Sequence, residues 1–147
     1  MPQRYDFWRE TYVHFQLGDA KAVISFGRAP TTAFPLQALT IYAVVKNVRQ
    51  AGRIYAQLFD HASPGFPISA KYEDVLPNET RPFALPTRFP ADAPSAKYHI
   101  VVGHEIKVGV DTEDIPDATS NTFTINRAMR TVEGVVARAV VLIAKPR

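Results

Sequence analysis

The sequence predicts a single all-β domain, an antiparallel β-sandwich of the immunoglobulin-like or jelly-roll type. Short runs of alternating apolar and polar residues recur about every 8–12 residues, with turn residues between them, which is typical of sandwiches. Most of the 12 prolines fall in the connecting segments. A chain of 147 residues, 46% of them hydrophobic, has the length of one domain and enough apolar residues for a core without disulfides.

The alternating runs predict strands that follow one another along the whole chain. We expect them at residues 11–17, 20–26, 39–45, 53–59, 68–75, 81–85, 97–110 and 121–125, with two more in 128–144 hinged at Glu133 and Gly134. Gly18 and Asp19 join the first two as a hairpin, and Gly103 predicts a bulge in the long strand. Residues 111–120 are expected to form an acidic loop. Residues 86–95 carry three prolines and are excluded from a central strand. Helical signals are limited to single turns at 5–11 and 126–129.

We divide the chain into an N-terminal arm, residues 1–12, and a sandwich domain, residues 13–147. Aromatic and arginine side chains are the ones that anchor protein interfaces. The arm therefore either packs back on the domain or docks on a neighbour through Tyr5, Phe7, Trp8, Arg9 and Tyr12.

The charge of the chain is unevenly distributed. Residues 122–147 contain five basic residues and a single acidic one, Glu133, although the net charge is only +3. The basic residues are too sparse for a nucleic-acid-binding stripe. They either form a solvated surface or meet an acidic neighbouring surface, and the interface residues proposed here are Arg138, Lys145 and Arg147.

Four carboxylates lie within seven residues of the expected acidic loop: Asp111, Glu113, Asp114 and Asp117. Several oxygen ligands on one loop suit a hard cation such as calcium, although the spacing and glycine of an EF-hand are missing. The alternative is a solvated loop that meets the basic C-terminal region of another copy.

The sequence contains no recognisable catalytic apparatus. It has no cysteine and no Gly-x-Ser-x-Gly elbow, and its seven glycines are scattered singly. Glu73 and Asp74 are adjacent, so in a strand they face opposite sides and cannot act as a pair. We expect no catalytic residues, no enzymatic activity and no cofactor.

We also expect no metal site. The chain has four histidines but no HExxH motif. His99 and His104 flank the expected bulge and, with a distant carboxylate, are conceivable ligands for zinc or copper. Exposed strand histidines are the simpler interpretation.

Aromatic residues surround the proline-rich loop. Phe66 and Phe89 are candidate residues for stacking on a sugar, and burial in the core is the alternative.

The chain has no apolar run of signal-peptide type at its start and none of membrane-spanning length. We expect a location in a virion or the cytoplasm and no membrane partner.

The order of features between about residues 39 and 125 resembles the adhesion-related, fibronectin-like modules called CARDB domains. The resemblance is carried by the strand ending Val44-Val45-Lys46-Asn47, the turn at residues 76–80, the strand ending Val108-Gly109-Val110-Asp111 and the segment 120–125. The turn at 76–80 lacks the glycine that those modules have, and Asn121 stands where two asparagines are usual. The resemblance implies a β-sandwich and a binding or structural role.

Two functions remain open. In the first, the chain is a non-enzymatic structural protein that self-associates as a homo-oligomer and builds or decorates a larger assembly, such as a phage capsid or another part of a virion. In the second, it is an adhesion module that binds carbohydrate or a cell surface.

Overall fold

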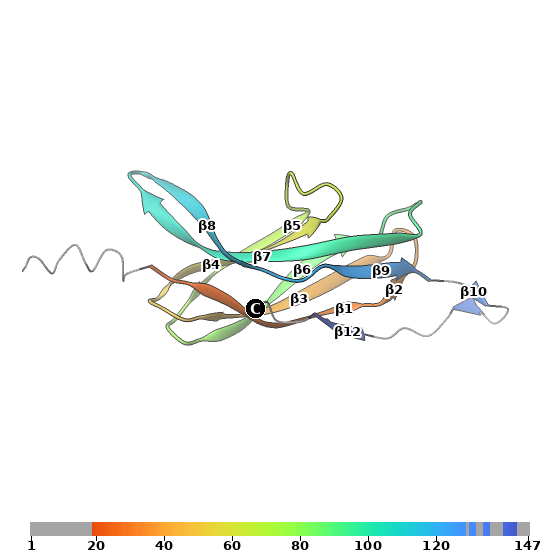
Figure 1. Ribbon diagram of the computed structural model, residues 1–147, viewed down its shortest axis with the longest axis horizontal. Helices are drawn as coiled ribbons and strands as arrows, with labels where there is room; N and C mark the ends of the chain where they lie inside the picture. The colour runs from red at the N-terminus through yellow and green to blue at the C-terminus, as the bar shows by residue number, and fades with distance from the viewer. Residues whose placement is uncertain (1–18, 129, 132–133, 136–139, 144–147) are drawn as a thin grey trace, which may run out of the picture.

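Two β-sheets packed face to face make up the body of the molecule (Figure 1). The computed structural model describes residues 19–128, 130–131, 134–135 and 140–143. The prediction of an all-β sandwich is confirmed, with strands from Ala22 to Ile143 and no helix in the described residues.

Sheet I has the strand order β12-β1-β3-β6 and is antiparallel throughout. Its strands are β1 (Ala22–Pro30), β3 (Ala38–Asn47), β6 (Thr80–Arg88) and β12 (Val140–Ile143). β6 continues through Pro86, beyond the predicted end at residue 85. β6 is the edge strand of sheet I, so one of its sides has no neighbouring strand among the described residues. Pro82 and Pro86 have no N–H to donate, and an edge strand tolerates this because no partner on the free side needs that donor.

Sheet II has the order β2-β9-β7-β4-β5, and β8 pairs with the far half of β7. Its strands are β2 (Thr32–Ala33), β4 (Gly52–Asp60), β5 (Ser69–Val75), β7 (Ser95–Val108), β8 (Asp111–Thr119) and β9 (Phe123–Arg127). β2 lies parallel to β9, and this short strand falls where the sequence predicted only a connector.

The chain crosses repeatedly between the two layers of the sandwich. β1, β3 and β6 share one sheet, while β4, β7 and β9 share the other. β10 (Arg130–Thr131) and β11 (Gly134–Val135) pair as a separate two-stranded antiparallel sheet.

The core lies between the sheets, and alternation of buried and outward-facing residues along a strand is clearest in β3. Residues Leu39, Ile41, Ala43 and Val45 of β3 are buried, and the alternate residues point away from the core. The largest fully buried side chains are Tyr55, Phe83, Phe89, Ile41, Ile54, Leu58, Leu85, Ile100 and Ile125.

Asn47 is a fully buried polar residue whose hydrogen bonds are all made. Its side-chain amide donates to the carbonyls of Gln50 and Val75 at 2.7 and 3.0 Å. Its side-chain oxygen accepts the backbone N–H groups of Lys21 and Arg49 at 3.2 and 3.1 Å. Asn47 therefore joins the end of β3 to the end of β5, one strand from each sheet.

Several sequence predictions need correction. Residues 111–120 are not a loop, because Asp111–Thr119 is strand β8. The helical turn predicted at 126–129 is wrong where it is described, since β9 extends to Arg127. The predicted bulge is confirmed by a register shift between Val102 and Gly103. The strand and hairpin predicted at residues 11–19 lie almost wholly outside the described residues.

Candidate functional site

The hairpin formed by β7 and β8 projects from the body of the sandwich, as Figure 1 shows at the upper left. At its tip Val108 pairs with Asp111, so the loop consists of Gly109 and Val110. Gly109 has φ 67°, as the first loop position of a type II′ turn requires. Val108 is 51% exposed and Val110 100% exposed. The hairpin thus presents two apolar side chains at its end.

Residues 105–114 of this hairpin, called the acidic hairpin below, contain four carboxylates and one lysine, Lys107. Glu105 forms an ion pair with Arg53 at 3.5 Å, and Asp114 accepts a hydrogen bond of 2.6 Å from the hydroxyl of Tyr72. Asp111 and Glu113 have no ion-pair partner in the described part of the chain. The outer end of the hairpin therefore carries two carboxylates without an ion pair against one lysine, a net negative charge.

Tyrosine packing holds the base of the hairpin on sheet II. The hydroxyl of Tyr55 lies against Gly103 at the bulge, where a Cβ atom would be 2.5 Å from it. Tyr55 packs on Tyr72 with ring centroids 5.5 Å apart. Burial, helped by nearby Asp114, raises the pKa of Tyr55. Burial, followed by the hydrogen bond that the hydroxyl donates to Asp114, raises the pKa of Tyr72 to about 12. Both hydroxyls therefore remain protonated donors at neutral pH.

A second contact ties the hairpin to sheet I. The Nδ1 atom of His104 lies 2.8 Å from Oδ2 of Asp117, and the same oxygen accepts the backbone N–H of Ala22 at 2.9 Å. Both side chains are only 8% exposed. This contact joins β7 and β8 to the start of β1, so the hairpin is anchored rather than loosely attached.

The outward side of sheet I has the opposite charge. None of β1, β3 and β6 contains an aspartate or glutamate. The outward-facing cationic and aromatic residues of these strands, called the basic face below, are Phe26, Arg28, Tyr42, Lys46 and Arg88. Phe26 is 44% and Tyr42 40% exposed.

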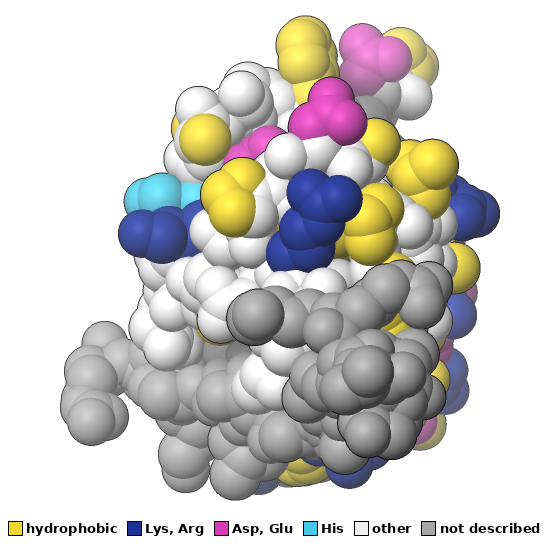
Figure 2. Space-filling view, turned by 90° about the vertical axis from the view of Figure 1, so that its right-hand side faces the viewer, with side chains coloured by type: hydrophobic (Ala, Val, Ile, Leu, Met, Phe, Trp, Pro, Cys, Tyr) yellow, Lys and Arg dark blue, Asp and Glu magenta, His cyan; other side chains and the backbone are white. Residues whose placement is uncertain are grey.

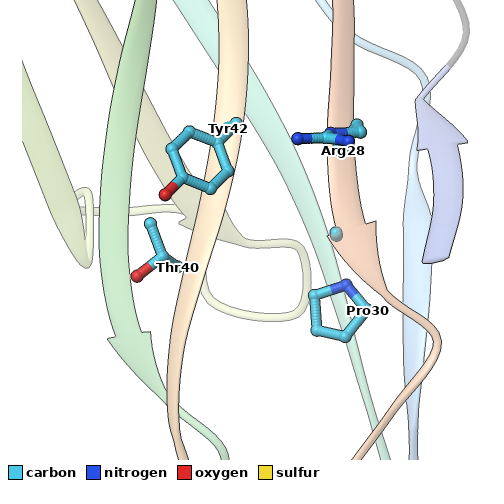
Figure 3. Close-up of a pocket in the computed structure, with 5 residues that line it drawn as sticks. Arg28, Pro30, Thr40 and Tyr42 are labelled. Carbon is cyan, nitrogen blue, oxygen red and sulfur yellow. The ribbon is translucent and has the colours of Figure 1, made fainter. Parts of the chain in front are cut away.

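A shallow hollow of about 210 Å³ lies in the basic face, lined by Arg28, Ala29, Pro30, Thr40 and Tyr42. Figure 3 shows Arg28 and Pro30 on β1 beside Thr40 and Tyr42 on β3. The register pairs Arg28 with Tyr42 directly across the two strands. An arginine and a tyrosine at the rim of an open hollow are suited to contact another molecule.

Figure 2 looks onto the molecule from the right-hand side of Figure 1, and the acidic side chains that it shows lie toward the top, beside hydrophobic ones. Lysine and arginine side chains lie at the centre and at the sides of this view. Charge is thus unevenly spread over the visible surface as well as between the two sheets.

The interface residues predicted from the sequence lie outside the described residues. These are Tyr5, Phe7, Trp8, Arg9 and Tyr12 in the arm and Arg138, Lys145 and Arg147 at the other end of the chain. They remain predictions.

The predicted cation loop does not form as expected. Asp117 turns toward His104, Asp114 binds Tyr72, and Asp111 and Glu113 lie further out along β8. Within the described residues, no three His, Cys, Asp or Glu side chains are placed to hold a metal ion together. The strand spreads these carboxylates along its length, whereas a loop would have drawn them together.

The predicted ligand-stacking pair is also not formed. Phe89 is fully buried, while Phe66 is 85% exposed in the loop between β4 and β5. Phe89 lies just beyond β6, where its N–H donates to the carbonyl of Gln37 and its carbonyl accepts the N–H of Leu36. These bonds fold the segment inward, so the alternative of core burial holds for Phe89.

His99 and His104 do not share a site either. His104 pairs with Asp117, whereas His99 lies beside His61 with 3.2 Å between their Nδ1 atoms. The sequence reasoning missed the basic face entirely, although the absence of Asp and Glu from three expected strands was visible in the sequence.

No protein-family model matches the chain, and the comparison with curated proteins finds no match. The resemblance to CARDB modules therefore stays a prediction. Within the described residues, no helix has the length and apolar character needed to cross a membrane.

Proposed function

We propose that this protein is a non-enzymatic interaction module that associates with copies of itself, the acidic hairpin of one copy docking on the basic face of the next. The observation that carries the proposal is the separation of charge. Three strands of sheet I contain no carboxylate, while the acidic hairpin has four and a single lysine. Complementary potentials of this kind steer association and set its register.

The two surfaces also offer apolar contact area. Val108 and Val110 are exposed at the tip of the hairpin, and Phe26 and Tyr42 are exposed on the basic face. Burying these side chains on association supplies the hydrophobic contribution, because exposed surface charges alone stabilise contacts weakly. A hollow beside Tyr42 gives the hairpin tip a place to sit.

The hairpin belongs to sheet II, and the basic face is the outward side of sheet I. A hairpin therefore has to meet the basic face of a different copy, and the contact is head-to-tail. Contacts of this type close into rings or continue as filaments. Both outcomes fit a subunit that builds or decorates a larger assembly, and a virion is the setting that we propose for it.

The test uses charge reversal and solution mass. The double variant Asp111→Lys/Glu113→Lys reverses the charge of the hairpin. The double variant Arg28→Glu/Lys46→Glu reverses the charge of the basic face. Each double variant is expected to be monomeric by light scattering where the unmodified chain is oligomeric. A chain that carries all four changes regains opposite charges on the two surfaces and is expected to associate again.

An equimolar mixture of the two double variants gives a sharper result. One variant is then basic on both surfaces and the other acidic on both, so each is expected to stay monomeric alone while the mixture associates with the two variants alternating. Asp92→Lys changes an exposed carboxylate in the β6–β7 loop and serves as the control that leaves association intact. An unmodified chain that stays monomeric at high concentration and low salt would overturn the proposal.

Carbohydrate binding is the second candidate, and one observation favours it. Tyr42 presents an exposed ring beside Arg28 and Thr40 at the hollow of the basic face. A glycan array on which binding is lost in Tyr42→Ala, together with a monomeric unmodified chain, would replace self-association by this function.

A further inference from the structure

Two histidines from neighbouring strands of sheet II meet at the surface. His99 lies on β7 and pairs in register with Phe59 of β4, and His61 follows the end of β4 at Asp60. Their Nδ1 atoms are 3.2 Å apart, and their rings are nearly perpendicular at 87° with centroids 5.2 Å apart. The two nitrogens therefore point at one another.

The ring of His99 and the backbone of His61 are held in place by contacts outside the pair. His99 stacks on Phe59 with the ring planes 6° apart and the centroids 5.3 Å apart. The backbone N–H of His61 donates to the carbonyl of Lys97 at 2.8 Å, which continues the β4–β7 ladder past the strand end. Asp60 fixes the following turn, since its carboxylate accepts the N–H of Ala62 at 3.0 Å.

This spacing fits a shared metal ion. Zinc binds imidazole nitrogens at about 2.0–2.1 Å, and a tetrahedral angle between two such bonds places the nitrogens about 3.3 Å apart. The observed separation of 3.2 Å already matches this value, and an ion replaces the shared proton once the rings turn so that both lone pairs meet at it. A site that is already formed avoids the ordering cost that a flexible pair of ligands would incur.

The chemistry of the pair selects the class of metal. Neutral imidazole suits copper, nickel and zinc, whereas calcium and magnesium require oxygen ligands. Affinity for these metals rises from nickel to copper and falls again to zinc.

An open hollow of about 500 Å³ borders His61, and Asp60 and Lys97 also line it. Solvent therefore reaches the His61 side of the pair. No group of three metal-ligating side chains forms in the described part of the chain, so water or another molecule fills the other coordination positions.

We propose that His61 and His99 form a two-nitrogen binding site for a divalent ion of the copper, nickel and zinc class. The site uses no residue of the acidic hairpin or the basic face. The metal-site proposal therefore holds whether or not the chain self-associates.

The test is titration of untagged full-length protein with CuCl₂, followed by NMR of the histidine ring protons. Substoichiometric copper is expected to broaden the signals of His61 and His99 before those of His14 and His104. Calorimetry is expected to give one ion per chain with affinity in the micromolar range. Broadening of His14 or His104 first, or no binding, would overturn the proposal.

Variants make the assignment specific. His61→Gln changes an exposed side chain, so it is expected to fold as the unmodified chain does while weakening copper binding more than about 10-fold, the loss that even outer-shell partners cause. His14→Gln is the matched control and is expected to leave the affinity unchanged. Copper bound equally well by a folded His61→Gln variant would refute the site.

Discussion

One carboxylate oxygen of Asp117 accepts two contacts at once, from Nδ1 of His104 at 2.8 Å and from the backbone N–H of Ala22 at 2.9 Å. Ala22 begins β1 of sheet I, and Asp117 lies in β8 of sheet II. A single side chain thus links the base of the projecting hairpin to the opposite layer of the sandwich.

Replacing Asp117 is expected to destabilise the protein strongly. Asp117→Ala leaves the ring of His104 and the N–H of Ala22 without partners at a site only 8% exposed, and each buried group left unsatisfied costs about 1–3 kcal/mol. Asp117→Asn is expected to cost less, since the amide oxygen still accepts one bond. Urea unfolding measures both. A loss below about 0.5 kcal/mol, typical of a surface substitution, would show that the link is not structural.

Gly103 cannot accept a side chain. A Cβ atom there would lie 2.1 Å from the carbonyl oxygen of Ile115 and 2.5 Å from the hydroxyl of Tyr55. Gly103→Ala is therefore expected to lower the free energy of unfolding by about 3 kcal/mol or more, because backbone and a buried ring both have to move. Gly65→Ala is the control, since nothing lies within 4 Å of its added atom. Equal melting temperatures for the two variants would contradict this packing.

The sequence predicted the bulge at Gly103 but not the close packing of Tyr55 and Ile115 against it. A glycine inside a strand pattern is a local signal, so the bulge could be predicted from the sequence alone. The strand β8 gave no such signal, because aspartate, glutamate and proline are poor strand formers and only pairing with β7 overrides that preference. The contact between His61 and His99 depends on the register of β4 with β7, which no local pattern specifies. Phe89 is buried because backbone bonds to the segment at Leu36 and Gln37 fold it inward, again a contact between distant residues.

Asn47 is expected to be irreplaceable by residues of similar size. Asn47→Asp keeps the oxygen that accepts from Lys21 and Arg49 but loses the N–H donors to Gln50 and Val75, and it buries a charge. Asn47→Leu loses all four bonds. Each variant is expected to cost about 2–4 kcal/mol by chemical denaturation, since buried backbone groups are left without partners. The exposed Asn78→Asp variant is the control, because its side chain is not buried. Comparable losses for the two positions would show that the hydrogen bonds of Asn47 contribute little.

The histidine pair is expected to make stability depend on pH. Burial, and then repulsion from His61, lowers the pKa of His99 in the folded protein, so the unfolded chain takes up protons first as the pH falls. The contribution of His99 is complete above the ordinary histidine pKa of about 6.5 and is lost progressively below it. The difference in unfolding free energy between pH 7.5 and pH 5.5 is therefore expected to be larger in the unmodified protein than in His99→Gln.

His61→Gln separates the two causes of this pKa shift. It removes the repulsion but leaves His99 stacked on Phe59, so it is expected to reduce the pH dependence without abolishing it. NMR titration of the His99 ring gives the same comparison at a single site, and its pKa is expected to rise toward the ordinary value in this variant. A His99 pKa that is unchanged in His61→Gln would show that burial alone lowers it, and that the two rings do not influence each other's charge.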